Sequence, residues 1–184
     1  KIFSRGPKYL SRYSGFRKTI LNKRILDILK NNINGYIEYG CTSWGPMQLI
    51  AERGFHCTSI IPARNIFWDC SSHGNQIKNY DYKIIKESEL ENIKEFSRKS
   101  ILNLILVLDH IEEPVNFLKN LIKKGIKYIF IILETRKDEG HLPIQHLTGW
   151  NKKSLIYLAE SLNSEIEFID LNTNLYISAM LKII

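Results

Sequence analysis

The amino-acid sequence predicts a doubly wound α/β fold, with a mainly parallel sheet of seven strands and a terminal antiparallel β-hairpin. Segments with strand and helix character alternate along most of the chain. Two of them, Ile101–Leu108 and Ile126–Leu133, are nearly all apolar, which is typical of parallel strands covered on both faces. Only residues 172–174 separate the last two strands, Ile166–Leu171 and Leu175–Ile183, and so short a connection makes them antiparallel. A length of 184 residues, 44% of them hydrophobic, suits one such domain.

The first elements follow from apolar spacing and turn-forming residues. Ile20–Lys30 has apolar residues at helical spacing and predicts a helix. The β-rich run Tyr36–Tyr39 predicts the first strand. A helix begins at Pro46, because a first helical turn tolerates proline, and it ends near Gly54. Phe55–Ile61 predicts the second strand.

The central and later elements follow the same reasoning. Residues 63–79 show no periodicity and predict a long loop. Tyr82–Ile85 predicts the third strand, and Glu89–Ser97 a polar helix or loop. Pro114–Lys123 and Ser154–Leu162 have one apolar side each and predict helices. Ligands bind such sheets at the carboxyl ends of the strands, near the reversal of strand order, so we expect the site in the loops there.

Positive charge is concentrated at the start of the chain. The net charge is +7, and the first thirty residues hold nine basic side chains against one acid, Asp27. Out of totals of 26 and 19, this leaves 17 basic and 18 acidic side chains for the rest. We therefore divide the chain into a basic N-terminal arm and helix, residues 1–34, and one domain, residues 35–184. The arm has the charge to meet nucleic acid or an acidic partner, but no nucleic-acid-binding motif accompanies it, which favours a solvated arm.

Cysteine usage and the absence of targeting signals favour a reducing, cytoplasmic location. Cys41, Cys57 and Cys70 form no even disulfide framework and have no CxxC spacing. Cys70 and His73 lack the second ligand pair of a zinc site, so we expect no metal. No apolar run reaches the roughly 18 residues that a membrane span needs. Because the chain begins with Lys1 rather than Met, we expect it to be processed or cut from a longer protein.

Three motifs in order along the chain carry a resemblance to a known family. Residues 38–45 read EYGCTSWG, residues 108–114 read LDHIEEP, and residues 150–155 read WNKKSL. They resemble (D/E)xGCGxG, LEHxxDP and WTPESL of the class I (Rossmann-like) S-adenosylmethionine-dependent methyltransferases. The resemblance extends over about residues 35–184. It implies the class I fold and S-adenosylmethionine as cofactor.

The resemblance also implies roles for particular residues. A general base for the methyl acceptor is expected at His110 or at His146, which shares its loop with His141. Each position also has a structural interpretation, such as a capping aspartate at Asp109 or a tight-turn glycine at Gly40. The cofactor-binding positions that the resemblance implies are Glu38, Gly40, Cys41, Thr42, Ser43, Trp44, Ile61, Glu87 (near the adenine side) and Asp109.

The sequence departs from the family pattern at three of these positions. Thr42 and Trp44 stand where the family has glycines, whose missing side chains let the backbone approach the cofactor. Ile61 stands where the family places a carboxylate that accepts hydrogen bonds from the ribose hydroxyls. Loss of that acceptor weakens nucleoside binding by ~1.5–3 kcal/mol.

Two hypotheses about function follow, from different classes. The first is a methyltransferase that acts on a small-molecule or sugar-like acceptor. The second is a catalytically inactive methyltransferase-fold domain that serves as a binding or scaffolding module for a protein partner, with Trp44 filling the pocket. A third, an α/β-hydrolase with Ser43, Asp109 and His146, is disfavoured because its nucleophile turn requires glycine where Cys41 stands.

Overall fold

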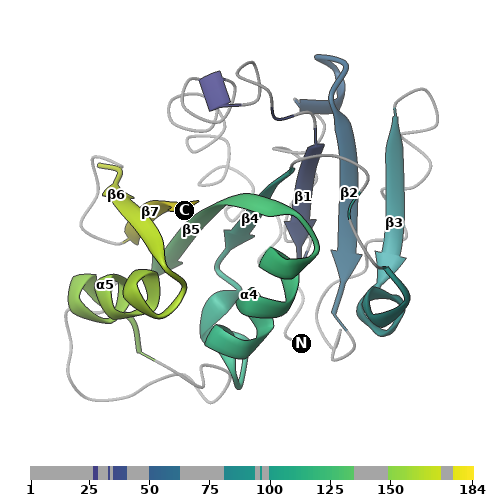
Figure 1. Cartoon of the computed structure of the whole chain (residues 1–184). Coiled ribbons are helices and arrows are strands. Elements are labelled where there is room, and N and C mark those ends of the chain that lie inside the picture. Colours follow the sequence, from purple (N-terminus) through teal and green to yellow (C-terminus); the bar gives the residue numbers. More distant parts are fainter. Residues whose placement is uncertain are drawn as a thin grey trace, which may run out of the picture.

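A computed structural model of the chain confirms the predicted fold class (Figure 1). It describes residues 27–28, 33, 35–40, 50–62, 81–93, 96, 100–134, 149–170 and 176–184. Seven strands form one sheet in the order β3-β2-β1-β4-β5-β7-β6. The strands are β1 (Gly35–Tyr39), β2 (His56–Ile61), β3 (Tyr82–Lys86), β4 (Ser100–Ile105), β5 (Ile126–Glu134), β6 (Ser164–Phe168) and β7 (Tyr176–Ile183).

Strand direction divides the sheet into two parts. Strands β3, β2, β1, β4 and β5 are parallel, so their carboxyl ends lie at one edge of the sheet. The order runs outward from β1 to β3 and then resumes on the other side of β1 with β4, which places the reversal between β1 and β4. Strand β7 is antiparallel to both β5 and β6 and lies between them.

Helices cover one face of the sheet through apolar side chains. Figure 1 shows α4 (Pro114–Lys123) and α5 (Lys152–Ser161) on the same side. Pro114 occupies the first turn of α4, where its missing N–H costs nothing, and the helix buries Leu118 and Leu121. Asn151 caps α5 by accepting a hydrogen bond of 3.0 Å from the Ser154 backbone N–H. Two short 3-10 helices, η3 (Glu87–Asn92) and η4 (Leu108–His110), follow β3 and β4.

The core lies on both faces of the sheet. On the face of α4 and α5, buried strand residues such as Ile37, Ile60 and Leu102 pack with the helices. On the opposite face, Tyr36 and Ile101 belong to a second buried cluster. Its other members are Ile33, Ile50, Ala51, Cys57, Ile105, Phe130, Ile132 and Met180. The alternation of neighbouring residues between the two clusters explains the continuous apolar runs of the sequence.

The structure corrects several element boundaries. The helix predicted at Ser154–Leu162 is α5, which begins at Lys152 and ends at Ser161, and the helix or loop predicted at Glu89–Ser97 begins as η3 at Glu87 and leaves the helix after Asn92. The predicted strand Ile101–Leu108 ends at Ile105, because Leu106 has a left-handed backbone (φ 53°) and the chain then forms η4. The strand predicted at Ile166–Leu171 begins earlier and ends at Phe168. Of the predicted helix Ile20–Lys30, the structure describes Asp27 and Ile28, both helical; the rest of the arm, most of the helix from Pro46 and the loop 63–79 lie outside the described residues.

Gly40 is the position where the turn after β1 requires glycine. Its φ is +72°, and an added Cβ would lie 2.9 Å from Cγ2 of Val107, beyond the end of β4. We expect Gly40→Ala to lower the free energy of unfolding by about 2–4 kcal/mol in denaturant titrations, through backbone strain and overpacking.

Gly54→Ala is the matched control, because Gly54 also has positive φ (+82°) but its Cβ would meet nothing within 4 Å. Only the strain should appear there, about 1–2 kcal/mol. Trimming Val107 to alanine in the Gly40→Ala background should recover part of the difference. Equal losses at the two glycines would contradict the contact with Val107.

Candidate functional site

The candidate site lies along the carboxyl edge of β1, β2, β3 and β4. Gly40 follows β1, Ile61 and Pro62 lie at the end of β2, Glu87 follows β3 and Asp109 lies beyond β4. Parallel pairing brings these positions to one edge of the sheet, next to the reversal of strand order. This is where ligands bind in open α/β sheets.

A row of three buried polar side chains crosses the centre of the sheet. Glu38 of β1 is the register partner of Ser59 on β2 and of Asn103 on β4, so the three lie side by side on one face. Their exposed fractions are 1%, 0% and 0%. No residue within the described part of the chain offers a hydrogen bond to Ser59 Oγ or to either polar atom of the Asn103 side chain. Buried polar groups normally have hydrogen-bond partners, so these three side chains are candidates for polar contacts with a ligand or with other parts of the chain.

Tyr39 and Glu87 join the ends of β1 and β3. The Tyr39 hydroxyl donates a hydrogen bond of 2.6 Å to Glu87 Oε1. The Tyr39 ring meets the Phe117 ring of α4 edge-on, with centroids 4.7 Å apart. Burial raises the pKa of the Tyr39 hydroxyl, and the hydrogen bond to Glu87 and its charge raise it further, so the hydroxyl keeps its proton.

Asp109 and His110 follow β4 on η4. Asp109 is buried, whereas the His110 side chain is 34% exposed, and His110 Nε2 lies 3.8 Å from Asp109 Oδ1. The His110 backbone N–H donates to the Val107 carbonyl at 2.9 Å. The imidazole is therefore held at the carboxyl edge beside a carboxylate while remaining open to solvent.

The structure shows an apolar end for β2. Ile61 and Pro62 are half-buried, and the described residues at the end of this strand include no carboxylate. The predicted positions Cys41, Thr42, Ser43 and Trp44, and His141 and His146 of the later loop, lie outside the described residues. The structure thus gathers Glu38, Gly40, Ile61, Glu87, Asp109 and His110 at one edge.

Sequence reasoning missed Ser59, Asn103 and the partnership of Tyr39 with Glu87. Asn103 carried a readable signal, because it is the polar residue within the apolar run of the fourth strand. Trp150, from the third motif, also has a buried indole Nε1 to which no described residue is hydrogen-bonded. The pairing of Tyr39 with Glu87 depends on strand order, which local patterns do not report.

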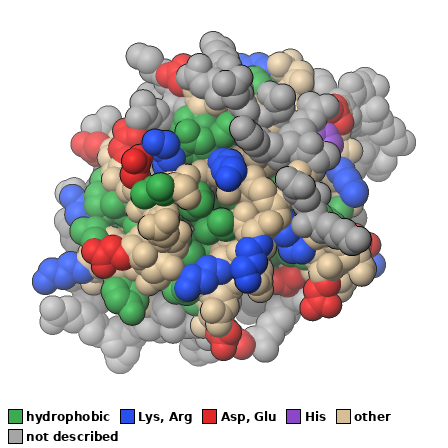
Figure 2. All heavy atoms as spheres, in the orientation of Figure 1, with side chains coloured by type: hydrophobic (Ala, Val, Ile, Leu, Met, Phe, Trp, Pro, Cys, Tyr) green, Lys and Arg blue, Asp and Glu red, His purple; other side chains and the backbone are tan. Residues whose placement is uncertain are grey.

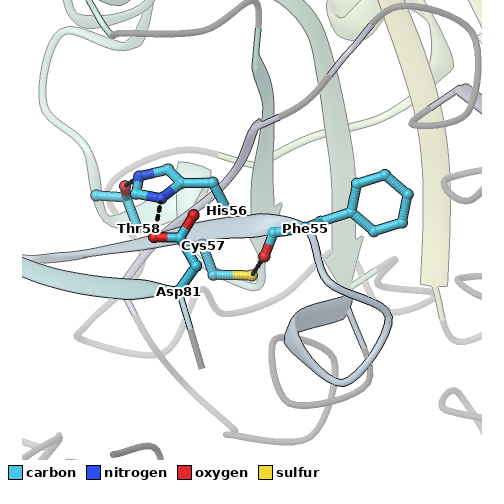
Figure 3. Close-up of polar contacts among 5 residues, drawn as sticks. All are labelled: Phe55, His56, Cys57, Thr58 and Asp81. Carbon is cyan, nitrogen blue, oxygen red and sulfur yellow. Dashed lines mark hydrogen bonds and ion pairs between the residues drawn. The ribbon is translucent and has the colours of Figure 1, made fainter. Parts of the chain in front are cut away.

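A second polar cluster lies at the opposite, amino-terminal end of β2 (Figure 3). His56 Nδ1 lies 2.8 Å from Asp81 Oδ1, and His56 Nε2 lies 3.4 Å from Thr58 Oγ1. The Cys57 thiol donates to the Phe55 carbonyl at 3.5 Å, and burial raises its pKa. This cluster connects β2 to the residue that precedes β3 and stands apart from the carboxyl edge.

Neither a metal cluster nor a membrane-spanning helix occurs in the described part of the chain. Its residues include no group of three or more His, Cys, Asp or Glu side chains that could hold an ion. None of its helices has the length and apolar character to cross a bilayer. On the face that Figure 2 shows, basic side chains are interspersed with acidic and apolar ones.

Comparison with known proteins finds similarity in structure. No protein-family model and no curated protein matches the chain. Solved structures do match, among them a SAM-dependent methyltransferase from Aquifex aeolicus, with TM-score 0.67, 10% identity and coverage of 96% of both chains. The chain has the class I methyltransferase fold. Another similar structure is the PH0226 protein from Pyrococcus horikoshii OT3, with TM-score 0.65, 12% identity and coverage of 98% of this chain and 93% of that one.

A third similar structure contains bound SAH. Magnesium protoporphyrin IX methyltransferase from Synechocystis, in complex with SAH, has TM-score 0.63 and 8% identity over 93% of this chain and 84% of its own. The resemblance seen in the sequence is therefore confirmed for the methyltransferase fold. Residue roles within that fold remain predictions.

The buried amide of Asn103 yields a stability prediction. We expect Asn103→Val to raise the free energy of unfolding by about 1–2 kcal/mol, because it removes a buried polar group that lacks hydrogen-bond partners among the described residues. Denaturant titration measures the change, and Asn120→Val on the exposed side of α4 is the control. A loss of more than about 1 kcal/mol would show that the amide is satisfied in the folded protein.

Proposed function

We propose that this chain binds S-adenosylmethionine at the carboxyl edge of β1 and β4 and transfers its methyl group to a small-molecule acceptor. One observation carries the proposal: the buried carboxylate of Glu38 lies two residues before the left-handed turn at Gly40, where the strand order reverses. A turn of this kind lets the backbone approach a ligand closely.

The residues at this edge fit the cofactor chemically. The cofactor supplies an electrophilic methyl group on a positively charged sulfur. Glu38 and Asp109 would offer buried carboxylates to that positive charge, and Ser59 and Asn103 add polar atoms beside Glu38. The residues that would hold the cofactor are Glu38, the Gly40 turn and Asp109.

His110 is the proposed base. Its imidazole is partly exposed at the same edge, near the carboxylate of Asp109. An acceptor hydroxyl or amine must lose a proton as the methyl group is transferred, and an imidazole nitrogen can accept that proton. Placement of the acceptor in line with the methyl group supplies most of the remaining acceleration.

A second candidate function is a catalytically inactive binding module. The apolar end of β2, with Ile61 and Pro62, favours it, because the carboxylate that accepts the ribose hydroxyls is missing there. Cofactor binding separates the two functions, since the module needs no nucleoside.

The first test is isothermal titration calorimetry of the full chain with S-adenosylhomocysteine. We expect binding, and we expect Glu38→Gln to weaken it about tenfold or more because a charged acceptor is lost. Glu91→Gln, on the exposed side of η3, should bind as the wild type does. Thermal melts check that each variant folds. No heat from the folded wild type would contradict cofactor binding.

The second test concerns His110. We expect His110→Gln to reduce transfer of labelled methyl from S-adenosylmethionine to a panel of small alcohols and amines by about 10²–10⁴-fold. Affinity for S-adenosylhomocysteine should change less than about twofold, since the base acts on the acceptor. His56→Gln, at the opposite edge of the sheet, is the matched control. An unchanged rate in His110→Gln would remove this residue from the mechanism.

A further inference from the structure

The hydrogen bond between Tyr39 and Glu87 spans an intervening strand. Tyr39 ends β1, and Glu87 directly follows β3, while β2 lies between them in the sheet. Neighbouring strands are spaced so that β1 and β3 lie roughly 9–10 Å apart. A hydroxyl and a carboxylate that meet at 2.6 Å must therefore reach toward each other over the end of β2.

The register places both side chains on the same face. Tyr39, Ile60 and Ile85 are successive register partners across the three strands, and all three belong to the core that α4 covers. Glu87 is the first residue of η3, directly after β3, and its hydrogen bond to Tyr39 brings its carboxylate toward that face. Because β2 lies between β1 and β3, this hydrogen bond passes over the end of β2, where Ile60 and Ile61 lie.

The Glu87 carboxylate lies near the end of β2, where the sequence lacks the carboxylate that the family resemblance leads us to expect. Ile61 provides no acceptor at the end of β2, where the related enzymes are expected to hold the ribose. Glu87 comes from the neighbouring strand, but its carboxylate reaches the same end of β2.

The Tyr39 side chain is rigid enough to orient Glu87. It is buried, and its ring is fixed by the edge-on contact with Phe117. Because the hydroxyl keeps its proton, it remains a donor toward the carboxylate. A carboxylate held in this way loses little side-chain entropy when it accepts a ligand hydroxyl.

We propose that Glu87, oriented by Tyr39, accepts the ribose hydroxyls of the cofactor in place of the acceptor that Ile61 cannot provide. This inference rests on the proposed function, because it assigns a role within the same nucleoside site. Glu87 contacts the ligand, whereas Tyr39 is a positioning residue. The sequence resemblance implies a place for Glu87 near the adenine of the cofactor, whereas this proposal assigns Glu87 to the ribose.

Calorimetry with ligand analogues tests the assignment. The probes are S-adenosylhomocysteine, its 2′,3′-dideoxy analogue and S-inosylhomocysteine, which changes only the base. The wild type should bind S-adenosylhomocysteine about tenfold or more tightly than the dideoxy analogue. In Glu87→Gln the two ligands should differ by less than about threefold, while the preference for adenine over hypoxanthine should stay as in the wild type.

Tyr39→Phe separates positioning from structure. This variant keeps the ring against Phe117 and removes only the hydroxyl, so we expect a folded protein with a reduced preference for the ribose hydroxyls, between those of wild type and Glu87→Gln. Tyr157→Phe, on the exposed side of α5, is the matched control, and Glu91→Gln is the control for the carboxylate.

The outcomes distinguish this inference from the function on which it rests. If the wild type binds no S-adenosylhomocysteine, the proposed function fails. If it binds but Glu87→Gln retains the full preference for the ribose hydroxyls, or loses the preference for adenine instead, only the assignment of Glu87 fails. An unchanged preference in Tyr39→Phe would overturn the positioning role of the hydroxyl.

Discussion

The left-handed turn at Gly40 lies against the side chain of Val107, just beyond the carboxyl ends of the two central strands, β1 and β4. Gly40 adopts a left-handed backbone, and Val107 occupies the space that a side chain there would need. Leu106, next to Val107, is also left-handed, a conformation that costs a non-glycine residue roughly 1–2 kcal/mol. The chain therefore accepts backbone strain next to the carboxyl ends of β1 and β4, at the edge of the sheet where the candidate site lies.

Much of the fold could be predicted because its elements are locally encoded. The helix Pro114–Lys123 has the predicted bounds, since a first-turn proline and one apolar side determine it. The predicted end of β4 was wrong because Val107 and Leu108 remain apolar after the strand has ended. Hydrophobicity reports burial, and both strand and 3-10 helix are buried here. The left-handed backbone of Leu106 could not be predicted, because leucine is not a residue type that favours this conformation.

Some residues of the candidate site could be predicted from the sequence, and others could not. Glu38 and Gly40 could be proposed from the sequence because they lie in one short motif, EYGCTSWG, which resembles the glycine-rich turn of the methyltransferases. Asn103 became a candidate only because the structure places it beside Glu38 of β1. The hydrogen bond between Tyr39 and Glu87 depends on β1 and β3 lying on either side of β2. Such relations depend on register across the sheet, and one sequence does not reveal register between distant segments. The interactions that depend on pairing between distant strands were therefore the ones that sequence patterns missed.

The position of β7 has a consequence for the order in which the sheet can form. Strand β7 comes after β6 in the chain, yet it lies between β5 and β6 and pairs with both. Strand β6 therefore has no neighbour to pair with, and the border of β5 stays open, until residues 176–183 join the sheet. An open strand border is a template for aggregation. The insertion of β7 thus protects two strands at once, because it pairs with β5 on one side and with β6 on the other.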